Sequence, residues 1–365
     1  MSTPVDRVRL VIAQSGQSQG EFAVGVGLDA TKMSKSLAGS RRFSSLDLAR
    51  IAEHAGVTVD WLLTGEETAV ALAARAAVGS SAQVAIAEAG RLIGLRESAA
   101  RLGYPQPWQP IDLPRRHGRA VDQGAALAQQ ALAVMESAWR DPAEPDLAQA
   151  IESTFGIDVC ITSLGKGFDG LAASTTEAKL IVVALTPTAF RQRFTMAHEL
   201  GHLLAGDDQG IHPDIDIDSP AGRKDPTEIR ANAFASCLLM PEEFLRGNVA
   251  RGFDDTAFAA LSLRLMVSPS ALAYRLETLR LIDAMTRDRW LRMSASAAAR
   301  LSGDIAALGA ASDYATTARR PGLLSRDLFA AYVDQRTTLR LYASLLGVDS
   351  AILRRELERS DEIGG

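Results

Sequence analysis

The sequence is poor in cysteine and in aromatic residues, and it has no long apolar run. Only two of its 365 residues are cysteines, and 5% are Phe, Trp or Tyr. Cys160 and Cys237 are far apart and belong to no metal-binding motif, so we expect no disulfide framework and a reducing, cytoplasmic location. No apolar run reaches the roughly 18 residues of a transmembrane helix, and no basic start precedes an apolar stretch. We therefore expect neither a membrane span nor a secretory signal.

Apolar side chains, in contrast, are abundant. Hydrophobic residues make up 47% of the chain and charged residues 23%, which excludes a mostly disordered or collagen-like protein. A length of 365 residues predicts two or three domains rather than one. The net charge is -5, so any binding to nucleic acid must come from a local basic patch.

Helical periodicity dominates the chain, and β-rich segments are confined to its middle. A helix is expected from Thr186-Pro187 to about Leu204, because proline favours the first helical position and Gly206 favours a stop. Strands are expected over 158–162, 170–174 and 179–185. The predicted fold class is therefore mainly α with a small β-sheet, an α+β arrangement.

Prolines and changes in composition divide the chain into four parts. Four prolines between residues 104 and 114 cannot continue a helix, because proline lacks an N–H and restricts the residue before it. The predicted parts are a five-helix unit over 1–66, a helical and proline-rich linker over 67–118, a domain with the strands over 119–285, and a helical C-terminal region of unassigned role over 286–365.

Two histidines and a glutamate stand at a spacing that suits a metal site. In Met196-Ala-His-Glu-Leu-Gly-His202, the histidines are four residues apart and share one face of a helix. Both imidazoles could reach one Zn²⁺. Glu199, about 100° around the helix from His198, could take a proton from a zinc-bound water and pass it to a leaving amine. This is the H-E-x-x-H pattern.

A histidine on an apolar helix is more often an ordinary core or capping residue. Here the chain has five histidines, and two fall on the useful spacing around Glu199, which favours a metal site over coincidence. A catalytic zinc needs a third protein ligand. Glu228 at the start of an amphipathic helix is favoured by spacing, and His212 or a nearby aspartate is the alternative. These aspartates, in a loop with the composition of a solvated segment, are Asp207, Asp208, Asp214, Asp216 and Asp218.

The motif and its surroundings resemble the ImmA/IrrE family of zinc metallopeptidases over roughly residues 120–283. The segments that carry this resemblance are Phe168–Leu171, Arg191–Leu204, Glu228–Pro241 and Val267–Leu279. The resemblance implies a zincin-like domain with His198, His202 and Glu228 as zinc ligands and Glu199 as the catalytic base. Family members are endopeptidases that cleave repressor-type DNA-binding proteins, so it also implies a protein substrate of that kind, or the chain itself.

Asn232 lies inside the second of these motifs. Its amide could hydrogen-bond across to the zinc helix and support a ligand, or it could be an ordinary buried amide. Cys237 is interpreted as a small core residue and not as a ligand. His212 and Tyr274 are candidates for stabilising an oxyanion, although a structural role is the simpler interpretation of each.

The five N-terminal helices resemble a lambda-repressor-like helix-turn-helix domain of the Xre type. The matching segments are Ser18–Ala23, Asp29–Leu37, Gly39–Arg42 and Val59–Gly65. In such domains the second helix of the pair enters the major groove. The resemblance therefore implies that Thr31, Lys32, Ser34 and Lys35 face DNA. Phosphate contacts are expected from Ser18 and Gln19 at a helix start and from Arg41 and Arg42.

The charge of this unit is balanced overall but uneven along its length. Residues 1–66 contain seven basic and seven acidic residues, whereas residues 30–42 contain four cations and no anion. Positive charge is therefore focused where the helix-turn-helix would contact double-stranded DNA. The alternative is a helical protein-interaction module with the same fold.

Two functions are consistent with these motifs. The first is a zinc endopeptidase that is also a DNA-binding transcriptional regulator and derepresses genes by cleaving a regulatory protein. The second is a transcriptional regulator whose zincin-like domain is a non-catalytic sensor or dimerisation module. The presence of Glu199 favours the first, since a structural zinc needs no such glutamate. A homodimer is expected from the helix-turn-helix alone, because such domains often act in pairs.

Overall fold

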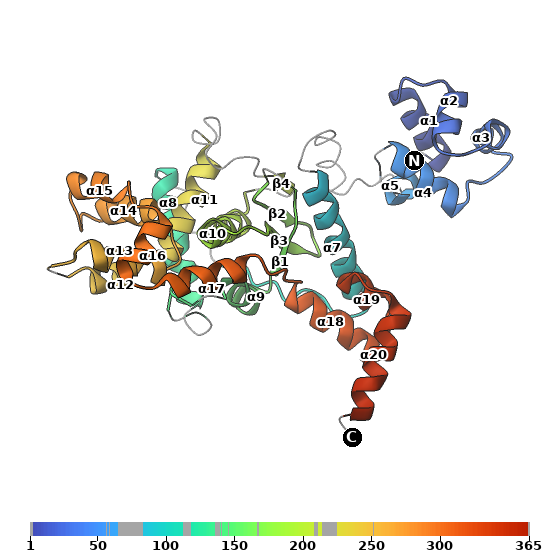
Figure 1. The fold of residues 1–365 in the computed structure, drawn as a ribbon. Coiled ribbons are helices and arrows are strands. Elements are labelled where there is room, and N and C mark those ends of the chain that lie inside the picture. The colour runs from blue at the N-terminus through green and yellow to red at the C-terminus, as the bar shows by residue number, and fades with distance from the viewer. Residues whose placement is uncertain are drawn as a thin grey trace. The chain divides into compact units, whose positions relative to one another are not determined.

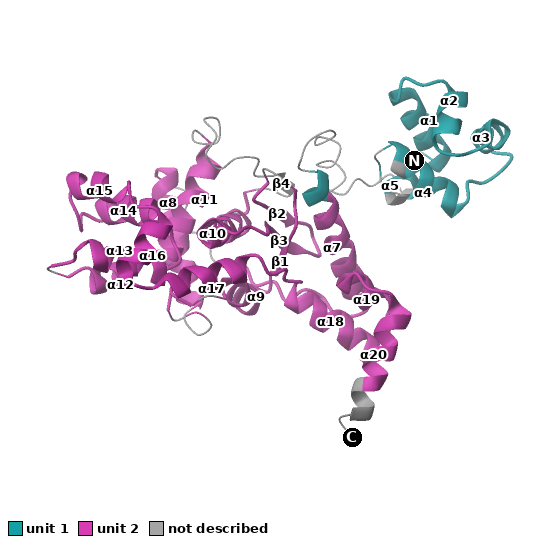
Figure 2. Cartoon of the chain, viewed as in Figure 1, with its two compact units in different colours: residues 1–86 teal, residues 87–365 magenta. Residues whose placement is uncertain are grey.

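The computed structural model describes most of the chain as two compact units, residues 1–86 and residues 87–365 (Figure 2). The described residues are 3–55, 57, 59–64, 83–111, 118–135, 139, 141–144, 146–165, 168–207, 211–213, 225–250 and 252–363. The predicted fold class is confirmed: helices dominate, and they accompany one small sheet (Figure 1).

Unit 1 contains five short helices around one apolar core. They are α1 (Pro4–Gln14), α2 (Gln19–Gly25), α3 (Ala30–Leu37), α4 (Ser45–Ala55) and α5 (Val59–Thr64). Phe22, Met33, Ile51 and Leu62 are fully buried at its centre, one from each of α2 to α5. Each helix is too short to be stable alone, so the common core must hold them together.

Side-chain caps set the start of the predicted helix-turn-helix pair. Ser18 and Glu21 form a capping box, in which the Ser18 hydroxyl accepts from the Glu21 N–H and the Glu21 carboxylate accepts from the Ser18 N–H at 2.8 Å. Asp29 caps α3 by accepting from the N–H groups of Thr31 and Lys32. These side-chain caps fix where α2 and α3 begin.

Unit 2 is built around a four-stranded sheet in the order β1-β3-β2-β4. The strands are β1 (Asp158–Thr162), β2 (Gly170–Ser174), β3 (Lys179–Ala184) and β4 (Ile211–Pro213). β1 runs parallel to β3, whereas β2 is antiparallel to both β3 and β4. The first three strands are almost entirely buried, as expected for short, uninterrupted apolar runs. β4 was not predicted, because its three residues lie in a loop of polar composition.

Helices of unit 2 pack on the sheet and on one another. Those before and beside the sheet are α7 (Gln83–Arg101, from residue 87 in this unit), α8 (Ala120–Met135), α9 (Leu147–Phe155), α10 (Ala189–Ala205) and α11 (Pro226–Leu239). Those that follow are α12 (Glu242–Asn248), α13 (Asp255–Arg264), α14 (Pro269–Thr278), α15 (Ala284–Trp290), α16 (Ala295–Ser302), α17 (Ile305–Ala315), α18 (Gly322–Val333), α19 (Arg340–Leu346) and α20 (Ser350–Ile363). The predicted helical character of residues 286–365 is confirmed over 286–363.

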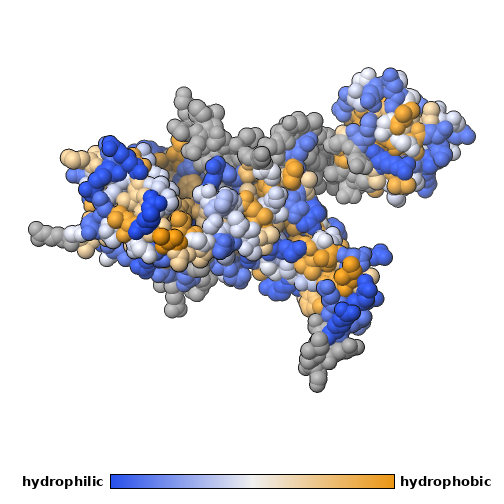
Figure 3. All heavy atoms as spheres, viewed as in Figure 1, coloured by the Kyte–Doolittle hydropathy of each residue, from blue (hydrophilic) through white to orange (hydrophobic). Residues whose placement is uncertain are grey.

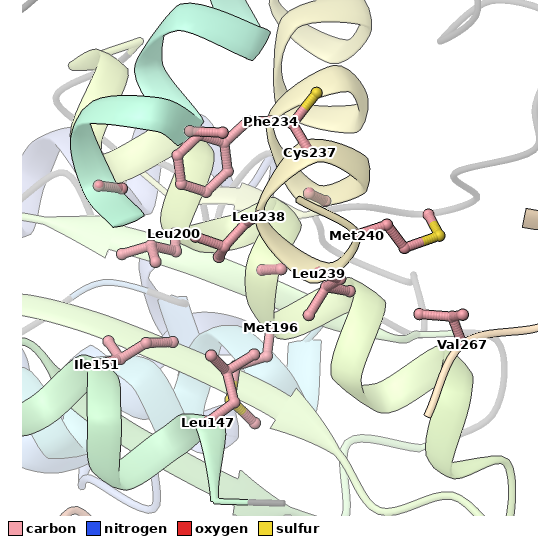
Figure 4. Close-up of a cluster of buried hydrophobic side chains, with 14 of the residues drawn as sticks. Leu147, Ile151, Met196, Leu200, Phe234, Cys237, Leu238, Leu239, Met240 and Val267 are labelled. Atoms are coloured by element: carbon pink, nitrogen blue, oxygen red, sulfur yellow. The ribbon is translucent and has the colours of Figure 1, made fainter. Parts of the chain in front are cut away.

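The main core lies where α9, α10 and α11 meet. Figure 4 shows Ile151 of α9, Met196 and Leu200 of α10, and Phe234 and Leu238 of α11 within one cluster of buried side chains. Because α10 buries 13 of its 17 residues, it is enclosed on nearly all sides. Polar side chains on this helix must therefore find partners inside the protein.

The start of α10 differs from the prediction, whereas its end agrees. The helix begins at Ala189 rather than at Pro187, and Thr188 is its N-cap. Tertiary hydrogen bonds explain the difference, since the Leu185 N–H donates to Thr162 O at 2.9 Å and the Thr186 N–H to Ala315 O at 3.3 Å. These bonds hold the two residues before Pro187 outside the helix. At the other end Gly206 adopts the expected left-handed conformation, with φ of 61°.

Part of the region predicted as a linker belongs to unit 2. Residues 104–111 form no helix, but Gln106 contacts the first residue of β3, with its Nε2 donating to Lys179 O at 2.8 Å and its Oε1 accepting from the Lys179 N–H. The Gln109 N–H donates to Phe155 O at 2.9 Å. The described part of the proline-rich stretch is therefore packed against β3 and α9.

The surface of unit 2 alternates between polar and apolar areas. Figure 3 shows apolar surface over α18 and α19 beside the more hydrophilic α20. Phe329 and Val333 of α18 contribute to it, with exposed fractions of 36% and 59%. Within the described residues no single helix is long and apolar enough to cross a membrane, although α13 and α14 together would pass on length and composition despite a bend of 108°.

Candidate metal centre

Two glycines allow the helices of the centre to approach closely. A Cβ on Gly201 of α10 would lie 2.9 Å from the Phe234 ring of α11, and a Cβ on Gly124 of α8 would lie 2.3 Å from Arg230 O. Side chains at either position would force the helices apart. Their absence brings the histidine face of α10 against the first turns of α11, where Glu228 lies.

His198, His202 and Glu228 converge on one point. The two Nε2 atoms are 3.0 Å apart. Nε2 of His198 lies 3.3 Å from Oε2 of Glu228, and Nε2 of His202 lies 3.3 Å from Oε1 of Glu228. Within the described residues this is the one group of three or more His, Cys, Asp or Glu side chains whose ligand atoms all lie within 4.8 Å of one another.

These separations fit a tetrahedral zinc ion. Ligand atoms about 2.0–2.1 Å from zinc at tetrahedral angles lie about 3.3 Å apart. The observed 3.0–3.3 Å between the nitrogen and carboxylate atoms is close to this value. Two imidazoles and one carboxylate are also the donor set of a catalytic rather than a structural zinc site, because three protein ligands leave the fourth position open. The residues present therefore fit the metal.

The second nitrogen of each imidazole contacts another side chain. Nδ1 of His198 lies 3.1 Å from Oδ1 of Asn232, and Nδ1 of His202 lies 3.4 Å from Oδ2 of Asp207. An Nδ1–H that donates to oxygen leaves the Nε2 lone pair free to bind a metal. Asn232 therefore lies where the supporting amide was predicted, on the imidazole of His198.

The charges around the centre are concentrated and mostly negative. Burial lowers the pKa of His202, but hydrogen bonds to Asp207 and Glu228 and the charges of Glu199 and Glu228 raise it to about 10. Burial raises the pKa of Glu228, but hydrogen bonds from His198 and His202 and their charges hold it well below its usual range. In the absence of metal, the carboxylates of this site thus favour a proton on His202. A divalent cation would neutralise the negative charge of the same carboxylates.

Glu199 lies beside the three convergent side chains and is nearly inaccessible, with 1% of its surface exposed. Its Oε1 lies near Gly170 of β2, where an added Cβ would be 3.6 Å from this oxygen and 2.6 Å from Thr195 Cγ2. Gly170 thus lets β2 lie against α10 at Glu199. A carboxylate so buried on the metal-facing helix is costly to keep and is the type of group that acts as a general base.

The other residues considered as ligands lie elsewhere or outside the described residues. Asp207 contacts Nδ1 of His202 and does not belong to the cluster of His198, His202 and Glu228. The side chain of His212 on β4 is not described. Asp208, Asp214, Asp216 and Asp218 lie outside the described residues.

Cys237 and Tyr274 are separate from the centre. Cys237 is a buried free cysteine in the main core, and Cys160 in β1 is also free and buried. Burial raises the pKa of both thiols, so each behaves as a small apolar side chain. Tyr274 of α14 is 54% exposed and stacks with the Arg287 guanidinium, 5.9 Å from its ring.

Sequence reasoning missed the contribution of Asp207 and Arg230. Arg230 of α11 is 8% exposed, pairs with Asp207 and donates to Gln123 Oε1 of α8 at 3.3 Å. The available signal was the position of Asp207 directly after the predicted helix stop at Gly206, which turns the chain back over the last helical turn.

Residues 152–277 match the family model of the IrrE N-terminal-like domain. This range begins in α9 and ends in α14, so it includes the sheet and the whole candidate centre. The chain is also similar to the radiation response metalloprotease IrrE of Deinococcus radiodurans, with 30% identity over 190 residues. The alignment covers 49% of this chain and 54% of that protein, so the chain spans about half the length of the relative. Unit 1 lies outside the matched range of the family model.

The residues predicted to contact DNA lie on the surface of unit 1, with one exception. Arg41 is half-buried, pairs with Asp47 at 2.7 Å and donates to the Ser36 hydroxyl at 3.0 Å, so much of its charge is already neutralised. Lys32 and Lys35 are exposed on α3, and the exposed set also includes Ser18, Gln19, Thr31, Ser34 and Arg42. Unit 1 therefore presents a basic and polar face on α3.

Proposed function

We propose that this chain is a zinc-dependent endopeptidase and a DNA-binding transcriptional regulator. The observation that carries the peptidase proposal is the convergence of His198, His202 and Glu228 beside the buried Glu199. The match to the IrrE N-terminal-like domain and the similarity to a metalloprotease support the same conclusion. Because members of the ImmA/IrrE family, which the motifs resemble, cleave repressor-type DNA-binding proteins, the proposed substrate is a regulatory protein of that type, whose cleavage derepresses genes.

The roles of the side chains follow from their positions. His198, His202 and Glu228 would hold zinc, which when bound polarises a carbonyl and lowers the pKa of water. Glu199 accepts the proton of the attacking water and transfers it to the nitrogen of the leaving amine. Its burial keeps bulk water away from this proton. Asn232 orients the imidazole of His198.

Metal analysis tests the site directly. Native mass spectrometry of the full chain should find one zinc per molecule in the wild type and in Glu199→Gln, because Glu199 is not a ligand. His198→Ala, His202→Ala and Glu228→Ala should each lose most of it. An unchanged zinc content in these three variants would remove the site. Cleavage itself is tested by comparing the wild type with Glu199→Gln in cells.

The DNA-binding part of the proposal rests on unit 1. Five helices with exposed Lys32 and Lys35 on α3 support a helix-turn-helix that docks in the major groove. Lys35→Ala should weaken binding to double-stranded DNA and reduce the slope of log affinity against log salt by about one. The control is Arg354→Ala, which removes an exposed cation of α20 in unit 2. An unchanged slope for Lys35→Ala would remove this contact.

The alternative is a transcriptional regulator whose zincin-like domain only senses or dimerises. The specific observation in its favour is the exposed apolar surface of α18 around Phe329 and Val333, which a dimer interface would cover. It predicts that Glu199→Gln changes neither the proteins of the cell nor gene expression.

A further inference from the structure

Asp207 lies directly behind the imidazole of His202. Its Oδ2 is 3.4 Å from Nδ1 of His202, whereas the Nε2 atom of that ring faces Glu228 at 3.3 Å. Nδ1 and Nε2 lie on different sides of an imidazole ring, so one carboxylate cannot both contact Nδ1 and bind a metal held by Nε2. Asp207 is therefore placed to act on the ligand and not on the metal.

The backbone fixes Asp207 in this place. α10 ends at Gly206, whose left-handed conformation reverses the chain after the last helical turn. The Asp207 N–H then donates to His202 O at 3.2 Å. Asp207 therefore contacts His202 through both its main chain and its side chain.

The opposite oxygen of Asp207 is held by another helix. Oδ1 accepts from Nη2 of Arg230 on α11, and Nη1 of the same guanidinium donates to Gln123 of α8. Both members of the pair are largely buried, with side-chain exposures of 6% for Asp207 and 10% for Arg230. A buried, two-sided contact of this kind restricts the rotation of the carboxylate.

We propose that Asp207, anchored by Arg230, is a positioning residue that fixes the ring of His202 for zinc binding. The inference rests on the proposed zinc site. With Oδ2 3.4 Å from Nδ1 of His202, the Asp207 carboxylate favours a proton on that nitrogen through its charge, selects the tautomer whose Nε2 faces Glu228, and makes Nε2 a stronger donor to the metal. Arg230 keeps Asp207 in this orientation, and Gln123 fixes Arg230. Side chains from α8, from α11 and from the end of α10 therefore all help to orient His202.

Zinc affinity tests the proposal without reference to peptidase activity. The full chain is titrated with zinc sulfate in competition with a fluorescent chelator. Asp207→Ala should weaken the affinity 10–100-fold, while one zinc still binds at saturation. Asp207→Asn keeps an acceptor but loses the charge, so its loss should be smaller. Asp141→Asn is the matched control, because Asp141 pairs with Arg264 at 3.0 Å on the surface and should leave the affinity unchanged.

A double-mutant cycle tests the anchor. Arg230→Gln alone should weaken zinc binding in the same direction as Asp207→Asn. The double variant should be little weaker than Asp207→Asn alone, since both changes interrupt one chain of contacts. Additive losses would show that Arg230 acts separately from Asp207 and would overturn the anchoring role. Thermal unfolding of each zinc-free variant separates a loss of fold from a loss of ligand orientation.

The outcomes distinguish this inference from the proposed function. Wild-type affinity in both Asp207→Ala and Asp207→Asn would overturn the positioning role while leaving the zinc site intact. Failure of the wild type to bind zinc would overturn the site and the inference together. A specific loss of affinity in the Asp207 variants, with the Asp141→Asn control unchanged, would support both.

Discussion

The two imidazoles of the candidate centre differ in what holds them. Both rings contact the Glu228 carboxylate through Nε2, but Nδ1 of His198 lies beside the neutral amide of Asn232, whereas Nδ1 of His202 lies beside the carboxylate of Asp207. A charged acceptor favours a protonated ring more strongly than a neutral amide does. The proton balance of the zinc-free site is therefore controlled by His202.

This difference predicts how zinc uptake depends on pH. His202 keeps its proton up to a pKa of about 10 in the zinc-free chain, and a ligating imidazole must lose it. We expect the apparent zinc affinity to rise from about pH 6 to about pH 9, with release of about one proton per zinc at neutral pH. Calorimetric titration in buffers of different ionisation enthalpy measures this release, and a pH-independent affinity without proton release would contradict the prediction.

The raised pKa of His202 has the opposite pH dependence for the stability of the zinc-free fold, which should fall as the pH rises. Because the folded-state pKa of His202 is raised from 6.5 to about 10, the protonated ring stabilises the fold fully below pH 6.5. This contribution is lost as the pH rises through about 10. Zinc should therefore protect the centre most strongly at alkaline pH.

The candidate site forms only if α10 and α11 lie in close contact. Gly201→Ala places a Cβ 2.9 Å from the buried Phe234 ring, so this ring must shift, and a shift of α11 with it would displace Glu228. We expect a loss of about 1–3 kcal/mol in the free energy of unfolding, together with weaker zinc binding. Denaturant unfolding and the chelator competition measure the two effects.

Gly94→Ala is the matched control for this prediction. Gly94 also lies inside a helix, α7, but an added Cβ there meets no atom within 4 Å. Alanine should therefore stabilise α7 by about 0.4–1 kcal/mol and leave the zinc affinity unchanged. If Gly201→Ala behaved like this control, the close approach of the two helices would not matter for the site.

Most elements were predictable because their signals are local. The bounds of β1 and β2 and the end of α10 at Gly206 follow from apolar runs and from a glycine stop. The start of α10 was missed because the Thr186 N–H bonds to Ala315, which is far away in sequence. The sheet order was missed for the same reason, since pairing between distant segments leaves no local pattern, and β4 was missed because its three residues lie in a loop of polar composition.

In the candidate site, too, local features could be predicted from the sequence, whereas contacts between distant segments could not. The spacing of His198, Glu199 and His202 is a property of one helix and could be recognised from the sequence. Glu228 was favoured by spacing and implied by the family resemblance, while the distances to it required the structure. Asp207 could not be distinguished from its neighbouring aspartates, because its role depends on the turn at Gly206 and on Arg230 of another helix.

At the scale of the whole molecule, a buried ion network joins distant parts of unit 2. Arg96 of α7 pairs with Asp158 of β1 at 2.7 Å and with Asp327 of α18 at 2.6 Å. All three side chains are at most 7% exposed. The free edge of β1 is also covered, since Ile161 pairs with Arg319. The C-terminal region is thus anchored to the sheet that supports the candidate centre.

Removing the central cation should destabilise this arrangement. Arg96→Met leaves Asp158 and Asp327 buried without their partner, so we expect a loss of about 3–5 kcal/mol in the stability of β1 and α18. Arg326→Met is the control, because Arg326 also pairs with Asp327, at 2.8 Å, but is 62% exposed and should cost at most about 1 kcal/mol. Hydrogen exchange of the β1 and α18 amides measures both, and equal effects of the two variants would contradict the role of burial.

If Glu199 makes this chain a peptidase, as proposed, its removal must change the protein termini found in cells. Terminal-peptide mass spectrometry is applied to cells that express the wild type or Glu199→Gln, with and without stress, after the purified variant has been shown to retain zinc. We expect at least one new protein N-terminus that appears with the wild type and is absent with Glu199→Gln. Identical termini in both, under resting and stressed conditions, would contradict it.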